Sequence, residues 1–286
     1  MTATIMDGKL VAAEVKQEVS GRVKHLQEQG VRPWLSTVLV GEDPASATYL
    51  RAKHRACEEV GVKSENHHLP SDSPQDKLEA LIDRLNHDDR VHGILVQLPL
   101  PKHLKEDRMI GKLDPDKDVD GLHPVNVGKL ASGTEGLVPC TPKGVVRLLQ
   151  HYKVQIAGSK ATIVNRSNLV GRPLAMLLLN RDATVTICHS KTKDLANVTR
   201  EADILVTAIG RPEVRIGPSY VKHGSTVVDV AINRVDGKLR GDIDFEPVSK
   251  IVQYITPVPG GVGPMTVAML LENTVQAAAL QARIRS

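Results

Sequence analysis

Short runs of branched aliphatic residues recur along this chain, with segments of helical spacing between them. These runs predict strands over residues 34–40, 91–97, 161–164, 183–188, 204–208 and 226–230. Apolar runs without polar alternation are typical of parallel strands that are covered by helices on both faces. The alternation of strand and helix therefore predicts an α/β fold built on parallel sheets.

Helical spacing and turn residues place the connecting helices. The predicted helices cover residues 10–29, 46–60, 144–151, 171–180 and 265–283. Gly30 and Gly61 follow the first two, at the position where glycine commonly ends a helix. A further helix is expected after Ser73, which can cap it with Pro74 in the first turn.

The length of 286 residues allows two domains, each with its own core. Residues 114–140 are rich in Asp, Gly and Pro, and they predict a linker that also carries site residues. We expect residues 1–120 and a returning C-terminal helix, residues 265–286, to form the first domain. We expect residues 121–264 to form a Rossmann-like, doubly wound second domain, with a cleft between the two.

Composition argues against several classes of protein. The chain has one Trp, one Phe and four Tyr, whereas platforms for single-stranded nucleic acid need stacked aromatic rings. A net charge of +4 without a basic cluster favours a mildly basic cleft for a small anion. Cys57, Cys140 and Cys188 lie far apart without CxxC spacing, so neither a disulfide framework nor a metal site is expected. Without a signal pattern or a long apolar stretch, we expect a cytoplasmic protein that binds no membrane.

Residues 164–173 join a predicted strand to a predicted helix, and turns of this kind cradle phosphates with backbone N–H groups. Asn165 and Ser167 stand where the G-x-G-x-x-G pattern has its first two glycines, and Asn tolerates left-handed backbone. The next strand ends near Ser190 and Lys191 without the carboxylate that holds an unphosphorylated ribose. With Arg166 in the preceding turn, this favours NADP; an ordinary turn and a solvated Lys191 remain alternatives.

Tyr49 and Lys53 are four residues apart and share one face of a predicted helix. The lysine can act as a base where it is desolvated, although such a pair is also common on a plain helix surface. Gln97 ends a predicted strand, at the carboxyl edge where α/β sites open. Asp118 and Asp120 flank Val119, and a carboxylate there can pair with two adjacent N–H groups of a heterocycle; an Asx turn before the following glycine is the alternative.

The loop at residues 257–264 is dense in Gly and Pro, which allows its backbone to approach a ligand closely or to act as a rigid hinge. With this loop, the chain resembles the bifunctional methylenetetrahydrofolate dehydrogenase/methenyltetrahydrofolate cyclohydrolase family. The matching segments span nearly the whole chain in the family's order: residues 49–53, 93–101, 117–121, 139–142, 166–173 and 255–266.

The resemblance implies two α/β domains and two reactions: hydride transfer from 5,10-methylenetetrahydrofolate to NADP⁺, then hydrolysis of the methenyl cation to 10-formyltetrahydrofolate. It implies that Lys53 is the catalytic lysine, Tyr49 stacks on the folate, Gln97 assists the lysine and Asp120 holds the pterin. Leu98, Pro259 and Gly260, in the matching segments, are expected to line the same substrate site.

For the cofactor, the resemblance implies that Arg166 and Ser190 meet the 2′-phosphate of NADP and that Ile232 lies near the nicotinamide. Asn165 and Ser167 are expected in the phosphate turn. The family usually has glycine where Asn165 and Ala231 stand, so these two positions put cofactor affinity in question. The resemblance also implies a homodimer formed through the cofactor domain.

Three other functions compete with this interpretation. An NADP dehydrogenase of a small hydroxy or keto acid would explain the second domain, but it would leave Tyr49, Lys53, Gln97 and Asp120 together unexplained. A ligand sensor without catalysis would have no need of Lys53. A nucleic-acid binder is disfavoured by the dispersed charge.

Overall fold

The computed structural model describes residues 2–282, and this part of the chain forms two compact units. The six-stranded unit contains the chain up to Ala13 and Thr141–Thr266, and the three-stranded unit contains Glu14–Cys140 and the chain from Val267 on. These compact units divide the chain differently from the expected domains. Residues before 14 join the six-stranded unit because β1 (Thr4–Ile5) pairs with β11 (Tyr254–Ile255) in its sheet. Residues 121–140, expected in the second domain, belong to the three-stranded unit.

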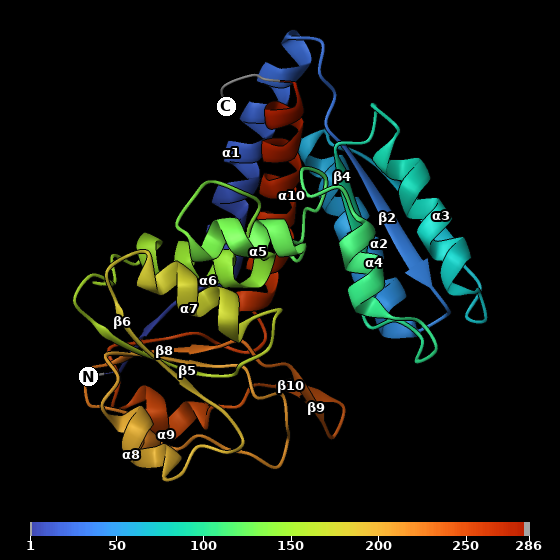
Figure 1. The fold of residues 1–286 in the computed structure, drawn as a ribbon. Helices are drawn as coiled ribbons and strands as arrows, with labels where there is room; N and C mark the ends of the chain where they lie inside the picture. Colours follow the sequence, from blue (N-terminus) through green and yellow to red (C-terminus); the bar gives the residue numbers. More distant parts are fainter. Residues whose placement is uncertain (1, 283–286) are drawn as a thin grey trace. The chain divides into compact units, whose positions relative to one another are not determined.

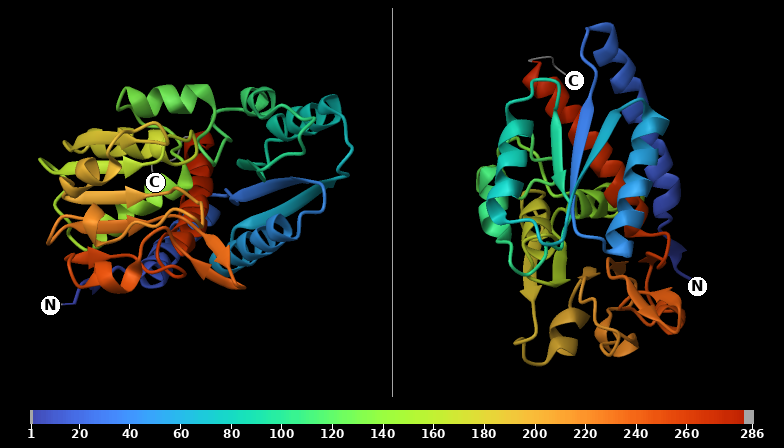
Figure 2. Two further views of the ribbon diagram at one scale, coloured as in Figure 1. Left: turned by 90° about the horizontal axis from the view of Figure 1, so that it is seen from below. Right: turned by 90° about the vertical axis from the view of Figure 1, so that its right-hand side faces the viewer.

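The three-stranded unit is a parallel sheet with helices on both faces (Figures 1 and 2). Its strand order is β3-β2-β4. Its elements are β2 (Trp34–Val40), α2 (Pro44–Val60), β3 (Lys63–Leu69), α3 (Gln75–Asn86), β4 (Gly93–Val96), α4 (Glu106–Lys112) and α5 (Pro124–Ala131). Helices α1 (Gly8–Glu28) and α10 (Val262–Gln281) each have residues in both units.

Local chemistry explains the elements that the sequence predicted well. All seven residues of β2 are buried, and its bounds are those predicted. The helix α2 is capped by Asp43, whose carboxylate accepts a hydrogen bond from the Ser46 N–H. It ends at Gly61, which has a φ of 81°, and Gly30 has a φ of 82° after α1.

Two local predictions were wrong. Ser73 does not cap α3; Pro74 occupies the N-cap position without a side-chain hydrogen bond, and the Ser73 carbonyl accepts from His103 instead. The linker contains the unpredicted helix α5, which begins where the ring of His123 accepts a hydrogen bond from the Val125 N–H.

The six-stranded sheet of this unit is fully parallel, with strand order β1-β11-β8-β7-β5-β6, and β9 and β10 form a separate antiparallel pair. Helices α6 and α7 cover one face, and α8 and α9 cover the other (Figure 1). The elements are α6 (Cys140–His151), β5 (Lys160–Val164), α7 (Gly171–Leu179), β6 (Thr184–Cys188), α8 (Leu195–Arg200), β7 (Ile204–Thr207), the short 3₁₀ helix η1 (Pro218–Tyr220), β8 (Thr226–Asp229), β9 (Asn233–Val235), β10 (Lys238–Arg240) and α9 (Phe245–Ser249).

The order of these strands confirms the doubly wound α/β prediction. From β5 the chain passes to β6 on one side and then to β7 on the other, so the winding reverses between β5 and β7. Ligands of open α/β sheets bind at such a switch point, outside the carboxyl ends of the strands. The six-stranded unit therefore has a defined place for a dinucleotide.

Candidate functional site

A lysine and a glutamine from separate elements meet in the three-stranded unit. Lys53 Nζ, on α2, donates a hydrogen bond of 3.0 Å to Gln97 Oε1, at the carboxyl end of β4. The Gln97 amide group in turn donates to the Leu98 carbonyl at 2.7 Å, which fixes which atom faces the lysine. The structure thus brings together two of the residues that the sequence singled out.

Tyr49 lies one helical turn before Lys53 on α2, and its side chain is 51% exposed. A large aromatic residue that remains exposed offers a ring face to a ligand at little cost in desolvation. Tyr49 and Lys53 therefore offer a stacking surface and a cation one turn apart on the same helix.

Asp120 lies two residues after Asp118, which forms an isolated parallel bridge with Ile94 of β4. The thiol of Cys140 donates to Asp120 Oδ1 at 3.6 Å. Enclosure of the carboxylate raises the pKa of Asp120, and the positive charge of Lys53 and the thiol lower it. Lys53, Gln97 and Asp120 are thus parts of one electrostatic group.

Lys117 anchors the loop that carries Asp120. Its buried Nζ donates to three backbone carbonyls at the end of α3, those of Leu85 at 3.3 Å, Asn86 at 2.7 Å and Asp88 at 2.9 Å. Burial lowers the pKa of Lys117, and nearby aspartates oppose that shift. The sequence did not assign a role to this lysine, because its partners are carbonyls of a distant segment.

Asn273 holds the other side of the same loop. Its side-chain amide, fully buried on α10, donates to the carbonyls of Val119 and Val138, both at 2.8 Å. The segment directly before Asp120 is therefore held at two points, Lys117 and Val119. Nothing in the helical spacing of α10 distinguishes Asn273 from a surface polar residue, so the sequence gave no sign of this contact.

His54, next to Lys53 on α2, makes two contacts through its ring. Its ring nitrogens contact Ser64 Oγ at 2.7 Å and Thr37 Oγ1 at 2.9 Å. Burial is the main cause that lowers the pKa of His54; Glu58 opposes the shift and Lys53 adds to it. Burial therefore favours the neutral form of His54.

Asp118 is almost fully buried, and one of its two carboxylate oxygens accepts hydrogen bonds. Oδ2 accepts from the His123 N–H at 2.7 Å and from Asn126 Nδ2 at 3.0 Å, whereas Oδ1 has no hydrogen-bond partner within residues 2–282. Burial raises the pKa of Asp118 to about 6, against the effect of these two donors. The charged form is therefore disfavoured in the folded protein.

Replacing Asp118 with asparagine is expected to stabilise the protein at neutral pH, because an amide keeps the accepting oxygen without the charge. A carboxyl whose pKa is raised on folding contributes stability below its unfolded value of 3.8, and that contribution is lost as the pH rises through 6. Relative to the wild type, the variant should gain roughly 2 kcal/mol between pH 4 and pH 7.5. Urea unfolding at both pH values measures this; parallel pH profiles for variant and wild type would contradict it. Asp116→Asn, at an exposed carboxylate of the same segment, is the control.

In the six-stranded unit, Asn165 organises the turn after β5. Its Oδ1 accepts from the N–H groups of Ser167 at 2.7 Å and Gly171 at 3.0 Å, and its Nδ2 donates to the Ala208 carbonyl at 2.6 Å. Asn165 does not have a positive φ, so a left-handed backbone is not the reason that it fits. Its side chain instead joins the ends of β5 and β7 across the switch point.

The residues expected at the 2′-phosphate lie at the same edge of the sheet. Val164 and Cys188 are register partners in β5 and β6, and Arg166 and Ser190 each follow two residues later, with both side chains exposed. Ile232, after β8, is 47% exposed. A cation, a hydroxyl and an apolar side chain are thus available at the carboxyl ends of this sheet.

The Gly/Pro-rich loop belongs to the six-stranded unit. Gly260 has a φ of 106°, and its carbonyl accepts from the Gly8 N–H at 2.9 Å. A Cβ at Gly8 would lie 1.7 Å from the Gly261 carbonyl oxygen, so this close approach requires glycine. The backbone of Gly260 is therefore held against Gly8.

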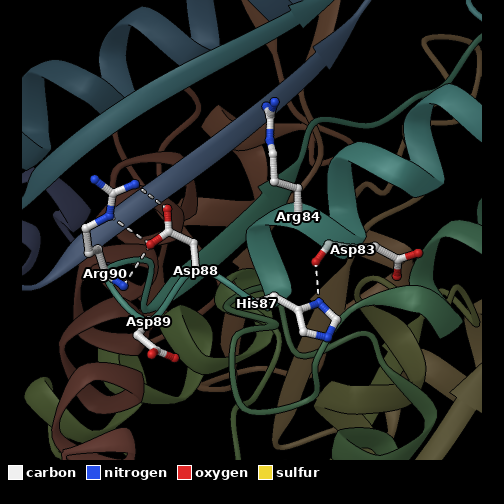
Figure 3. Close-up of a pocket in the computed structure, with 6 residues that line it drawn as sticks. All are labelled: Asp83, Arg84, His87, Asp88, Asp89 and Arg90. Atoms are coloured by element: carbon white, nitrogen blue, oxygen red, sulfur yellow. Dashed lines mark hydrogen bonds and ion pairs between the residues drawn. The ribbon is translucent and has the colours of Figure 1, made fainter.

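A further hollow of about 690 Å³ lies between the end of α3 and the start of β4 (Figure 3). It is lined by Asp83, Arg84, His87, Asp88, Asp89 and Arg90. Arg90 pairs with Asp88 at 2.7 Å, and hydrogen bonds from Arg90 lower the pKa of Asp88 to about 2. The hollow opens at the amino edge of the sheet, away from Gln97, and we assign it no function.

Within residues 2–282, no three His, Cys, Asp or Glu residues are grouped so that they could hold a metal ion. No helix of this part of the chain combines the length and apolar character that crossing a membrane requires. The three cysteines are buried thiols.

Comparisons with known proteins give concordant matches along the chain. Residues 6–120 match the model of the tetrahydrofolate dehydrogenase/cyclohydrolase catalytic domain. Residues 139–282 match the model of the NAD(P)-binding domain of the same family. The chain is 51% identical to the bifunctional protein FolD of Halalkalibacterium halodurans over 278 residues, which are 97% of this chain and 99% of that protein.

Solved structures give the same result. The bifunctional FolD of Campylobacter jejuni superposes with a TM-score of 0.94 at 52% identity, covering 97% of this chain and 99% of its own. The dehydrogenase-cyclohydrolase of Trypanosoma brucei, complexed with NADP cofactor and inhibitor, has a TM-score of 0.93 at 39% identity and covers 99% of each chain.

Proposed function

The chain belongs to the tetrahydrofolate dehydrogenase/cyclohydrolase family, and we propose on that premise that it carries out both reactions of a bifunctional member. In the first, 5,10-methylenetetrahydrofolate is oxidised to the 5,10-methenyl cation with NADP⁺ as hydride acceptor. In the second, water adds to the cation, which opens to 10-formyltetrahydrofolate. The contact of 3.0 Å between Lys53 Nζ and Gln97 Oε1 is the observation that carries this proposal.

Hydrolysis requires a group that moves a proton beside a cationic carbon. Lys53 is the group placed to take a proton from the water that attacks this carbon. Gln97 Oε1 accepts from Lys53 Nζ and holds it in place, while the Leu98 carbonyl holds the Gln97 amide. In the same site, Leu98 contributes a backbone contact to the folate.

Binding and orientation of the folate fall to Asp120 and Tyr49. A carboxylate accepts two hydrogen bonds from adjacent N–H groups of a pterin ring, and such charge-assisted bonds are strong. The exposed ring of Tyr49 stacks on the folate.

The residues at the carboxyl edge of the six-stranded sheet fit NADP. Arg166 and Ser190 offer a cation and a hydroxyl at the ends of adjacent strands, where a 2′-phosphate would be held. The turn at Asn165 and Ser167 would approach the diphosphate, and Ile232 would pack beside the nicotinamide. When bound, NADP⁺ supplies the hydride acceptor, and these residues orient it.

We also propose a homodimer through the six-stranded unit in the cytoplasm. The strand β6 lies at the end of the sheet and pairs only with β5 in the described chain, and Ile187 on it is 37% exposed. An unpaired edge with an exposed apolar residue favours association with a second copy. Buried thiols fit a reducing compartment. Light scattering of the purified protein tests the dimer, and a monomer at micromolar concentration would contradict it.

The function itself is tested by spectrophotometry. Purified protein mixed with 5,10-methylenetetrahydrofolate and NADP⁺ should first produce the absorbance of the methenyl compound, which then decays as it is hydrolysed. Michaelis constants for NADP⁺ and NAD⁺ measure the cofactor preference, with NADP⁺ expected to bind better. If no methenyl compound forms with either cofactor, or if a small hydroxy acid reduces NADP⁺ instead, the proposal is wrong.

A further inference from the structure

The loop after β7, Ala208–Gly210, lies at the switch point but has few backbone partners of its own. Its Ala208 carbonyl accepts from Asn165 Nδ2 at 2.6 Å. The N–H groups of the next two residues, Ile209 and Gly210, donate to the two oxygens of Asp242, at 2.6 Å to Oδ2 and 3.1 Å to Oδ1. Side chains from two other segments therefore determine where this loop lies.

Asp242 is itself rigidly held. It is fully buried, and its Oδ1 also accepts from Asn233 Nδ2 at 3.2 Å, while its own backbone carbonyl accepts from the Ile216 N–H at 2.9 Å. Burial raises the pKa of Asp242, whereas its three donors and the positive charge of Arg215 lower it. Displacing a buried carboxylate that accepts from three donors costs free energy. Each donor left without an acceptor stays buried, away from water, without a hydrogen bond.

A carboxylate that binds two consecutive N–H groups fixes the direction of the peptide between them. Gly210 has a φ of 66°, so the chain turns sharply at the residue that Asp242 binds. Because dinucleotides bind outside the carboxyl ends of the strands at a switch point, a shift of this loop alters the wall of the cofactor site. Neither the sequence pattern nor the spacing marks Asp242 for this role.

We propose that Asp242 is a positioning residue for the dinucleotide, which acts by holding the Ile209–Gly210 backbone at the switch point between β5 and β7. The inference rests on the proposed function for the identity of the cofactor. It assigns to Asp242 no contact with the cofactor and no part in hydrolysis. Its expected consequence is a selective loss of cofactor affinity when the carboxylate is replaced.

The test is the Asp242→Asn variant, which has the same shape but turns one accepting oxygen into a donor that faces a backbone N–H. Titration calorimetry with NADP⁺ should give a Kd about tenfold higher than that of the wild type, since one bond to a buried charge is replaced by a donor–donor contact. Hydrolysis of 5,10-methenyltetrahydrofolate, measured without any dinucleotide, should stay within twofold. Dehydrogenase activity should show a higher KM for NADP⁺ with a smaller change in kcat.

Asp203→Asn is the matched control. Asp203 also accepts a backbone N–H, that of Lys160 at 2.9 Å, but at the amino edge of the same two strands β5 and β7. It should leave the Kd for NADP⁺ unchanged. If Asp242→Asn does not fold, Asn233→Ala, which removes one donor to Asp242 but keeps both backbone bonds, should raise the Kd about threefold.

The inference is overturned if a folded Asp242→Asn binds NADP⁺ as the wild type does, or if it lowers hydrolysis and cofactor affinity in the same proportion. Should Asp242→Asn fail to fold, an unchanged Kd in Asn233→Ala overturns it equally. Failure of the proposed function has a different signature, because the wild type itself would then lack NADP⁺ binding or methenyl formation.

Discussion

A Lys53→Met variant is expected to hydrolyse 5,10-methenyltetrahydrofolate about 10²- to 10⁴-fold more slowly than the wild type, the range typical of a lost general acid–base group. Methionine keeps the length and apolar stem of the side chain but cannot donate to Gln97 Oε1 or carry a proton. The effect should fall on kcat, since the proton transfer occurs after the folate is bound. Decay of the methenyl absorbance, started from the methenyl compound itself, gives this rate directly.

Lys16→Met is the control for this variant. Lys16 also contacts α2, because its Nζ lies 2.7 Å from Glu59 Oε2. This is an exposed ion pair that does not involve Gln97. Exposed pairs contribute little to stability, so both activities should remain within twofold of the wild type. A Lys53→Met protein that hydrolyses at the rate of the wild type would show that the proton carrier is a different group.

An Asp120→Ala variant is expected to lose about 10²-fold in kcat/KM for both reactions. Each hydrogen bond to a charged group contributes about 1.5–3 kcal/mol, and the carboxylate is proposed to accept two from the pterin. Because the two reactions share one folate, they should fall together, mainly through a higher KM. Steady-state kinetics of each reaction, with the folate concentration varied, measures this.

Asp116→Ala, at the exposed carboxylate four residues earlier, controls for a change of charge in the same segment. It should leave both constants unchanged. Loss of hydrolysis alone in Asp120→Ala would move this carboxylate from folate binding to the chemistry of the second step, and unchanged kinetics would remove it from the site.

The parts of the fold that the sequence predicted are those in which one segment determines its own structure. The strand at 34–40 is a continuous apolar run, and its bounds are those observed. By contrast, β3 has the polar sequence Lys63–Leu69 and was not predicted, although all seven of its residues pair with β2. It is an edge strand, and its structure depends on β2 rather than on its own hydrophobic pattern.

The same distinction applies to the site. Lys53 and Gln97 could be singled out from helical spacing and from the end of a strand, and the structure joins them. Lys117, Asn273 and Asp242 could not, because each acts on backbone groups of a segment distant in the sequence. Asn165 was noticed as a departure from glycine, but the expected left-handed backbone was the wrong reason for it.

Lys117 has a consequence for how the protein responds to its medium. Three carbonyl oxygens converging at the end of a helix resemble the oxygen cages that bind monovalent metal cations in other proteins. Here the ammonium group of Lys117 occupies the position between these oxygens, and it is covalently attached to the chain. We therefore expect the loop next to Asp120 to keep its shape whether sodium, potassium or choline is the cation in solution, so exchange of these salts at constant ionic strength should leave folate affinity unchanged.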